Sequence, residues 1–387
     1  MPSDERVAPP AIEPVQEPAS RLPPRGTLLI VFAVLAALFT LTGILASAFH
    51  SAEKARAAAH FEAGNQFAAR DMNDDAIAEY RAALALDHSR TQYKHALATA
   101  LFNSGSLKEA EARLAELIAL DPSSGPINLM LARIAARGGD LSAAESYYHR
   151  SIYGLWPQDP QQYRQKTRFE LVELLLRNRI KKRAEAELLT LADEVGEDAG
   201  TKQRIGELFL AADSPQNAAE VFRELVKQDS RNATLSSALG TAEMRLANYR
   251  LARNALRTAV RLDPKDEEAA RQLQLVTDVL TLDPTARGLS RRERHRRSLE
   301  LLRRSSADVS RCAAQLGEQI PAGLKETLDH AAKELESRQR AVDETIDANI
   351  ALSEALFRLR EEHCPGLAEP DRAVAFTIRR LPAEEAP

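Results

Sequence analysis

The sequence has few cysteines and few aromatic residues, and its positive and negative charges are nearly balanced. Its 387 residues include two cysteines and one tryptophan, and aromatic side chains make up 5% of the chain. Two cysteines cannot build a disulfide-stapled mini-domain or a four-cysteine zinc site. The formal net charge is -4, with 52 basic and 56 acidic residues spread along the chain. This balance implies no bulk polyelectrolyte partner, so we expect no binding to nucleic acid.

The motifs of common enzyme classes are also missing. The sequence has no Gly-x-Gly-x-x-Gly, no phosphate-binding Gly-rich loop, no His-Glu-x-x-His and no Gly-x-Ser-x-Gly. Its eight histidines are scattered, and His363 beside Cys364 cannot complete a metal site without further ligands. The sequence therefore predicts no catalytic residue, no metal and no cofactor. An enzyme with its site in the C-terminal part is kept as an alternative.

Charge is absent from one long N-terminal stretch. Residues 1–26 are rich in Pro, Glu, Ala and Ser and predict a disordered segment. The next 23 residues, Thr27 to Phe49, are uncharged, and as a helix they span about 34 Å, enough to cross a bilayer. A transmembrane helix over 27–49 is the main prediction. The alternative is a cleaved signal peptide, because "ASA" at 46–48 has a small-x-small form, although the apolar run is longer than such signals use.

The charges that flank this stretch say little about its orientation. Arg21 and Arg25 precede it, while Glu53, Lys54 and Arg56 follow it. A short head, one span and a large remainder are typical of a single-pass protein. We expect anchoring in a bacterial inner (cytoplasmic) membrane, with the bulk of the chain periplasmic.

A stop signal recurs through the rest of the chain. "LALDHSR", "IALDPSS", "VKQDSRN", "VRLDPKD" and "LTLDPTA" place aspartates at 87, 121, 229, 263 and 283, and two of these intervals are 34 residues. Alanines expected in the second helix of each unit keep the same spacing, with one step of 40 that contains "YGLWPQDPQQ". They are Ala76, Ala110, Ala144, Ala184, Ala218 and Ala252. Small residues such as Gly64, Gly206 and Gly240 recur in the first helices, where two helices would cross closely. The pattern predicts helical hairpins that each end at a stop, often at a proline.

This arrangement resembles the tetratricopeptide repeat family, whose repeats are 34-residue helical hairpins. The resemblance covers about 210 residues and implies an all-α fold, a right-handed superhelical solenoid of helix-turn-helix repeats. The expected solenoid spans 57–266, after the transmembrane helix and before a capping helix at 267–283. Its six repeats are 57–90, 91–124, 125–158, 165–198, 199–232 and 233–266.

The same resemblance implies a concave groove, lined by the first helices, that holds peptides or partner helices. The positions carried over to this groove are Phe61, Asn65, His95, Thr99, Asn103, Arg133, Arg137, Glu173 and Arg177. Three arginines among them favour an acidic partner segment, and a solvated helix face is the alternative. The carboxylate clamp of the family's chaperone-tail binders is not present, because only Asn65 matches it.

The 34-residue spacing is not found after Pro284, and residues 285–387 predict a small helical bundle with an irregular tail. Its first helix is capped by Ser290 and is rich in arginine. These residues are Arg287, Arg291, Arg292, Arg294, Arg296, Arg297, Arg303 and Arg304, for which a solvated face is favoured over an acidic or lipid partner. A disulfide between Cys312 and Cys364 is a candidate, and it requires the helix after Leu324 to break near 337–344, where Asp343 would cap a new helix. Residues 373–378 are expected to be extended.

Together these observations predict a membrane-anchored scaffold that binds other proteins or peptides in the cell envelope. The main alternative is an envelope assembly factor, similar to the anchored repeat proteins of cytochrome c maturation, secretion or pilus machines.

Overall fold

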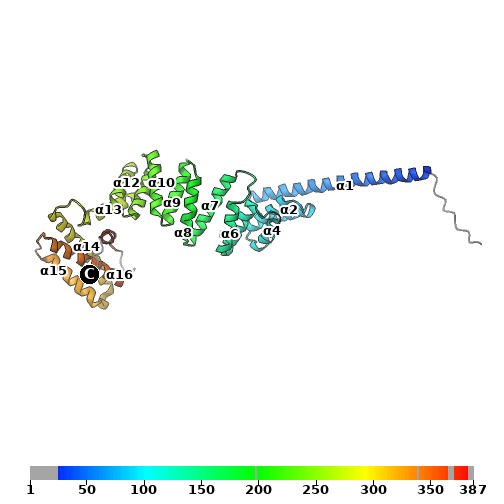
Figure 1. Cartoon of the computed structure of the whole chain (residues 1–387). Coiled ribbons are helices and arrows are strands. Elements are labelled where there is room, and N and C mark those ends of the chain that lie inside the picture. The colour runs from blue at the N-terminus through cyan, green and yellow to red at the C-terminus, as the bar shows by residue number, and fades with distance from the viewer. Residues whose placement is uncertain (1–24, 197, 338–339, 365–369, 382–387) are drawn as a thin grey trace, which may run out of the picture. The chain divides into compact units, whose positions relative to one another are not determined.

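The computed structural model describes residues 25–196, 198–337, 340–364 and 370–381. The predicted disordered segment lies outside these residues, apart from its last two. The described residues form α-helices, one short 3-10 helix and no β-strand, so the all-α prediction is confirmed. Figure 1 labels the helices in chain order. Their bounds are α1 Arg25–Ala68, α2 Asn73–Leu86, α3 Thr91–Asn103, α4 Leu107–Leu120, α5 Gly125–Gly138, α6 Leu141–Ile152, α7 Pro160–Arg177, α8 Lys181–Glu194, α9 Ala199–Ala211, α10 Pro215–Gln228, α11 Ala233–Arg245, α12 Tyr249–Leu262, α13 Glu267–Leu282, α14 Arg291–Leu316, η1 Gly317–Gln319, α15 Ala322–Glu336, α16 Asp343–His363 and α17 Arg372–Ile378.

Helix α1 joins the apolar stretch to the first repeat without a break. It has 44 residues, and its C-terminal part packs against α2 as the first half of a hairpin. The large apolar side chains from Leu29 to Phe49 are exposed, and Phe39 is 81% accessible. Among the described residues, this is the one helix long and apolar enough to cross a membrane. The prediction of a span at 27–49 separated from a repeat at 57 missed this continuity.

Hairpins follow one another along the chain, and a glycine sits at the crossing point of the two helices in three of them. A Cβ atom added to Gly64 would lie 2.5 Å from Tyr80 Cε1. The same addition to Gly206 would meet Phe222 at 2.7 Å, and to Gly240 would meet Leu256 Cγ at 2.5 Å. A large residue of the second helix therefore fills the space that the missing side chain leaves.

The turn inside each hairpin places one residue in the left-handed region. Two of these residues are glycines, but four are not, so the backbone geometry of the array and not the glycine content sets the turn. The residues are Asp71, Gly105, Gly139, Arg179, Asp213 and Ala247, which repeat the spacing of 34 with the one step of 40.

The recurring aspartates lie at the ends of four second helices and of α13. Each is the residue after the helix, and its carboxylate accepts a hydrogen bond from the backbone N–H two residues on. Only three of the five precede a proline, so the proline is not what the stops have in common. The shared device is this aspartate turn, an alternative to continued helix. The acceptors are Asp87, Asp121, Asp229, Asp263 and Asp283.

The insertion after α6 folds back onto the start of α5. Leu155 N–H donates to the Ser123 carbonyl at 2.8 Å, and Gly125 N–H donates to the Leu155 carbonyl at 2.9 Å. The Trp156 indole donates to the Ser151 carbonyl at 2.9 Å. The chain divides into two compact units directly after Trp156, so three hairpins lie in residues 1–156 and three in 157–387.

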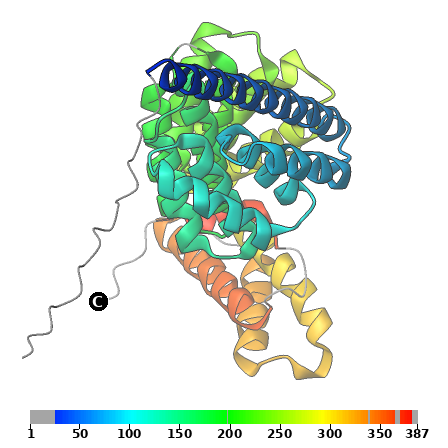
Figure 2. The ribbon, with the colours of Figure 1, turned by 90° about the vertical axis from the view of Figure 1, so that its right-hand side faces the viewer.

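The second unit continues from the last repeat into the C-terminal bundle. Helices α14, α15 and α16 pack on one another, and α17 packs on α13 (Figures 1 and 2). Residues 373–378 were expected to be extended, and this prediction was wrong because they lie within α17. The Asp371 carboxylate caps this helix by accepting from the N–H groups of Ala373 and Val374.

A disulfide joins α14 to the end of α16. Cys312 and Cys364 are bonded, with their Cα atoms 6.0 Å apart. Helix α15 ends at Glu336 and α16 begins at Asp343, which provides the chain reversal that the pairing needs. Asp343 does not cap α16 as proposed, since Val342 occupies the cap position. Its carboxylate pairs instead with Arg291 and Arg294 at 3.3 and 3.2 Å.

Candidate functional site

The predicted groove residues of the first repeat help to hold the hairpins together. The Phe61 ring stacks on Tyr93 of the next repeat, with ring centroids 4.7 Å apart. The Asn65 amide oxygen accepts a hydrogen bond from the Tyr80 hydroxyl at 2.9 Å, within its own hairpin. Both side chains are half-buried and bind neighbours of the same chain.

The three positions from the second repeat lie along α3 and differ in exposure. Thr99 donates its hydroxyl hydrogen to the His95 carbonyl at 2.9 Å, and Asn103 is exposed. His95 lines a hollow of about 380 Å³ with Leu117 and Ile127, and burial lowers the pKa of its imidazole. His95 is therefore placed to present a neutral ring to a ligand in this hollow.

Arg137 of the third repeat contacts Phe102 of the second repeat. Arg137 donates to the Phe102 carbonyl at 2.9 Å, and its guanidinium lies 3.7 Å from the centroid of the Phe102 ring. Arg245 repeats this bond in the second unit by donating to the Leu210 carbonyl at 2.5 Å. These arginines satisfy carbonyl groups at the end of the preceding first helix, which is a packing role that the sequence analysis missed. Arg133, one turn earlier on α5, is half-buried.

The two predicted positions of the fourth repeat belong to the second unit. Glu173 of α7 forms an ion pair with Arg204 of α9 at 2.5 Å, so it links two first helices. Arg177 is exposed at the end of α7. Of the nine predicted residues, Asn103, Arg137 and Arg177 are exposed, and Arg137 already has partners.

Most arginines of α14 are paired within the chain. Arg297 donates to Glu293 and to the carbonyl groups of Leu280 and Asp283, which end α13. Arg304 binds Asp371 through two bonds of 2.8 Å. Six of the eight arginines noted in the sequence have such a carboxylate partner. They are Arg291, Arg294, Arg296, Arg297, Arg303 and Arg304. The face predicted to be solvated is therefore largely an ion-paired face that positions α14.

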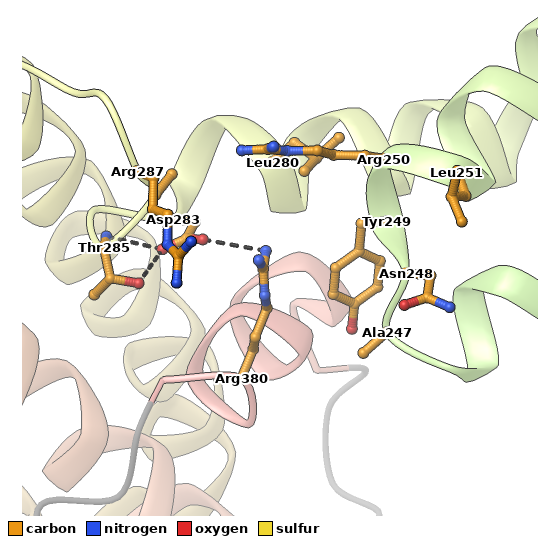
Figure 3. A pocket seen from close by; sticks show the side chains of 11 residues that line it. Ala247, Asn248, Tyr249, Arg250, Leu251, Leu280, Asp283, Thr285, Arg287 and Arg380 are labelled. Atoms are coloured by element: carbon orange, nitrogen blue, oxygen red, sulfur yellow. Dashed lines mark hydrogen bonds and ion pairs between the residues drawn. The ribbon is translucent and has the colours of Figure 1, made fainter.

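The tail of the chain contains an arginine to which the sequence analysis assigned no role. Arg380 follows α17 and forms an ion pair of 3.1 Å with Asp283 at the end of α13. Figure 3 shows its side chain between those of Asp283 and Tyr249. These residues and Arg287 line a hollow of about 500 Å³. We call this space the arginine hollow. Its lining residues are Ala247, Asn248, Tyr249, Arg250, Leu251, Leu280, Asp283, Thr285, Ala286, Arg287 and Arg380.

A second hollow of about 430 Å³ shares Ala247, Tyr249 and Arg380 with the first. The Tyr249 ring stacks on Phe376 of α17 with centroids 6.3 Å apart, so α17 closes the end of the last repeat. Burial raises the pKa of Tyr249, although the neighbouring Arg380 and Arg379 act in the opposite direction. The phenol is therefore a neutral hydrogen-bond donor at physiological pH.

The described residues show no arrangement suited to metal chemistry. Within residues 25–196, 198–337, 340–364 and 370–381, no group of three His, Cys, Asp or Glu side chains could hold a metal ion. The two hollows instead have charged and apolar lining residues, which suits the non-covalent binding of a ligand.

Residues 95–160 match the family model described as tetratricopeptide repeat, and the regular hairpins, small crossing residues and turns extend this pattern on both sides of the match. The chain contains tetratricopeptide repeats. Tetratricopeptide repeats stack into surfaces that bind proteins and peptides, so this chain is a scaffold for protein interactions.

Solved tetratricopeptide repeat structures are similar to parts of the chain at low identity. The type IV pilus biogenesis factor PilW is 14% identical over 57% of this chain and 98% of its own, with a TM-score of 0.38. PilF of Pseudomonas aeruginosa is 14% identical over 55% and 90%, with a TM-score of 0.32. YrrB, a repeat protein with an unusual peptide-binding site, is 15% identical over 56% and 90%, with a TM-score of 0.29. No curated protein is significantly similar to the chain in sequence.

Proposed function

We propose that the chain is a membrane-anchored scaffold, held by residues 27–49, that binds partner proteins in the cell envelope. The observation that carries this proposal is the continuity of α1. The exposed apolar stretch and the first half of the first hairpin form one helix, and only His50 to Arg56 separate the span from buried Ala57. A span built in this way holds the repeat array close to the membrane surface.

The membrane part of the proposal is tested by fractionation. After an alkaline carbonate wash, the full chain is expected to stay in the membrane pellet with its N-terminal segment intact. Release into the wash, or a mature N-terminus near Phe49, would show that the apolar stretch is a cleaved signal and not an anchor.

The bulk of the chain is proposed to lie on the periplasmic side of a bacterial inner membrane. This orientation leaves the short N-terminal head with Arg21 and Arg25 in the cytoplasm, although Lys54 and Arg56 on the other side of the span balance these two charges. It also places the Cys312–Cys364 pair in an oxidising compartment. Protease added to spheroplasts is expected to degrade the repeats, and resistance until the membrane is lysed would reverse the orientation.

The protein-binding part is tested by photo-crosslinking from the repeats. A photo-reactive amino acid is placed at Asn103 of α3 or Arg177 of α7, two exposed positions at the ends of first helices. Matched controls carry it at Glu111 of α4 or Leu189 of α8, which are exposed on second helices. Crosslinks to a partner protein from the first helices alone support a first-helix groove, whereas equal labelling from both sets of positions argues against it.

A further inference from the structure

The arginine hollow carries more positive charge than its own residues neutralise. Arg250, Arg287 and Arg380 line it, and Asp283 is its single carboxylate. Asp283 is buried, pairs with Arg380, and accepts further bonds from the N–H and the hydroxyl of Thr285 at 2.8 and 2.7 Å. Its charge is therefore used inside the fold, and Arg250 and Arg287 are exposed and form no ion pair with Asp283.

The start of α12 adds to this positive field. Its first-turn N–H groups have no intrahelical partner, and the cap residue Asn248 makes no side-chain bond to them. The Asn248 amide is used elsewhere, since it donates to Glu243 Oε2 at 2.9 Å. The first turn contains no acidic residue and instead carries Arg250, which the positive end of a helix dipole disfavours. An anion seated in the hollow would offset both charges.

The lining of the hollow also includes apolar and aromatic residues. Leu280 and the Tyr249 ring lie beside the arginines, and Leu251 is 52% exposed at the edge. Free phosphate or a lipid headgroup would use the arginines but leave these walls unmatched. A protein segment that alternates carboxylate and apolar side chains would use both, because guanidinium groups bind carboxylates and the leucines accept apolar contacts.

We infer that the arginine hollow binds an acidic segment of a partner protein, with carboxylates on Arg250 and Arg287 and an apolar side chain against Leu251. This inference rests on the proposed scaffold function and deepens it by naming the class of partner. The site is formed by the turn before α12 and its first turn, the end of α13 with the loop after it, and Arg380, the second residue after α17. It is thus separate from the first-helix groove, in which the sequence analysis expected arginines to attract an acidic segment.

The experiment compares three forms of the full chain in detergent. One is the natural chain, one carries Arg250→Glu and Arg287→Glu, and the control carries Arg257→Glu and Arg261→Glu. The control pair lies on the same helix, is exposed, and does not line the hollow, so both variants change the net charge equally. Each form is used to select from a random twelve-residue peptide library, and melting curves establish that all three forms fold.

The natural chain and the control are expected to enrich peptides with several Asp or Glu residues next to Leu or Phe. The best peptide should bind the Arg250→Glu and Arg287→Glu form at least about tenfold more weakly, as expected for the loss of charge-assisted bonds. Acidic enrichment that persists in that form, or no acidic enrichment at all, would overturn the inference.

Two further probes separate the sources of negative charge. Inorganic phosphate and vesicles that contain phosphatidylglycerol are each tested as competitors of the selected peptide. Weak competition by both is expected, whereas vesicle binding of the natural chain that displaces the peptide and disappears on Arg250→Glu and Arg287→Glu would assign the hollow to lipid and overturn the inference. If the crosslinks from Asn103 or Arg177 persist in the Arg250→Glu and Arg287→Glu form, the proposed scaffold function is still supported when the inference about the hollow fails.

Discussion

Asp308 of α14 and Arg360 of α16 form an ion pair of 2.8 Å inside the C-terminal bundle, with side chains only 3% and 7% exposed. About three turns away along the same two helices, the Asn349 amide of α16 donates to the Ser298 hydroxyl of α14 at 3.2 Å. These polar contacts fix the register of two long helices whose apolar contacts alone would tolerate sliding.

Removing one partner of this pair should destabilise the bundle strongly. Asp308→Asn leaves the Arg360 charge buried without its carboxylate, and the expected loss is about 3–5 kcal/mol of unfolding free energy. Arg311 also pairs with Asp308 at 2.9 Å but is 54% exposed, so Arg311→Met should cost less than about 1 kcal/mol. Denaturant titration followed by helical circular dichroism measures both changes, and equal losses would contradict the burial argument.

The crossing of α11 and α12 should not accept a side chain at Gly240. A Cβ atom there would stand 2.5 Å from Leu256 Cγ, so Gly240→Ala is expected to cost about 1–3 kcal/mol. Gly200 provides the control, because its nearest neighbour would lie 3.7 Å away. Gly200→Ala should leave the stability unchanged or raise it by up to about 1 kcal/mol. A raised melting temperature for Gly240→Ala would show that the helices do not approach as described.

The Cys312–Cys364 bond should be present in protein from the native compartment and should stabilise the bundle. The two residues are 52 positions apart, and a closed loop of that size corresponds to about 4 kcal/mol in the chain-entropy model. Mass spectrometry of unreduced protein should find no alkylatable thiol, and reduction should lower the unfolding midpoint. Two free thiols in such material would rule the bridge out.

The first turn of α14 predicts a pH dependence in the acid range. Hydrogen bonds from Arg296 and then Arg297 lower the pKa of Glu293 from 4.5 to about 2. Because the folded pKa is the lower one, the stabilisation is complete above about pH 4.5 and is lost as the pH falls toward 2. The stability difference between the natural chain and Glu293→Gln should therefore be constant from pH 7 to 5 and shrink below pH 4.5. A difference that grows in acid would contradict this sign.

The repeat architecture could be predicted because its signals are local and recur. Gly64, Gly206 and Gly240 each contact a large residue of the next helix. Because the distance along the chain between the two residues is the same each time, the sequence alone reveals the pattern. The same holds for Ser290, whose hydroxyl accepts from the Glu293 N–H at 3.2 Å as its position suggested. Such pairs depend only on the residues near them, so a single sequence reveals them.

The functions of the arginines could not be predicted, because they depend on residues far away in the sequence. Arg304 meets Asp371 and Arg380 meets Asp283 only after the bundle has folded. Helix α17 was missed for a related reason. "RAVAFTI" is rich in residues that favour strands, but the Asp371 cap and packing on α13 outweigh that propensity. The arginine hollow is formed by residues that are distant in the sequence, so no local motif predicts it.

The most direct measurement of the central claim is proximity labelling in cells. A labelling enzyme is fused to the full chain, and the control fuses it to residues 1–56 alone, which keep the apolar stretch but omit every complete hairpin. A scaffold anchored in the membrane predicts a reproducible set of envelope proteins that the full chain labels and the anchor alone does not. Identical sets from the two fusions would contradict the account.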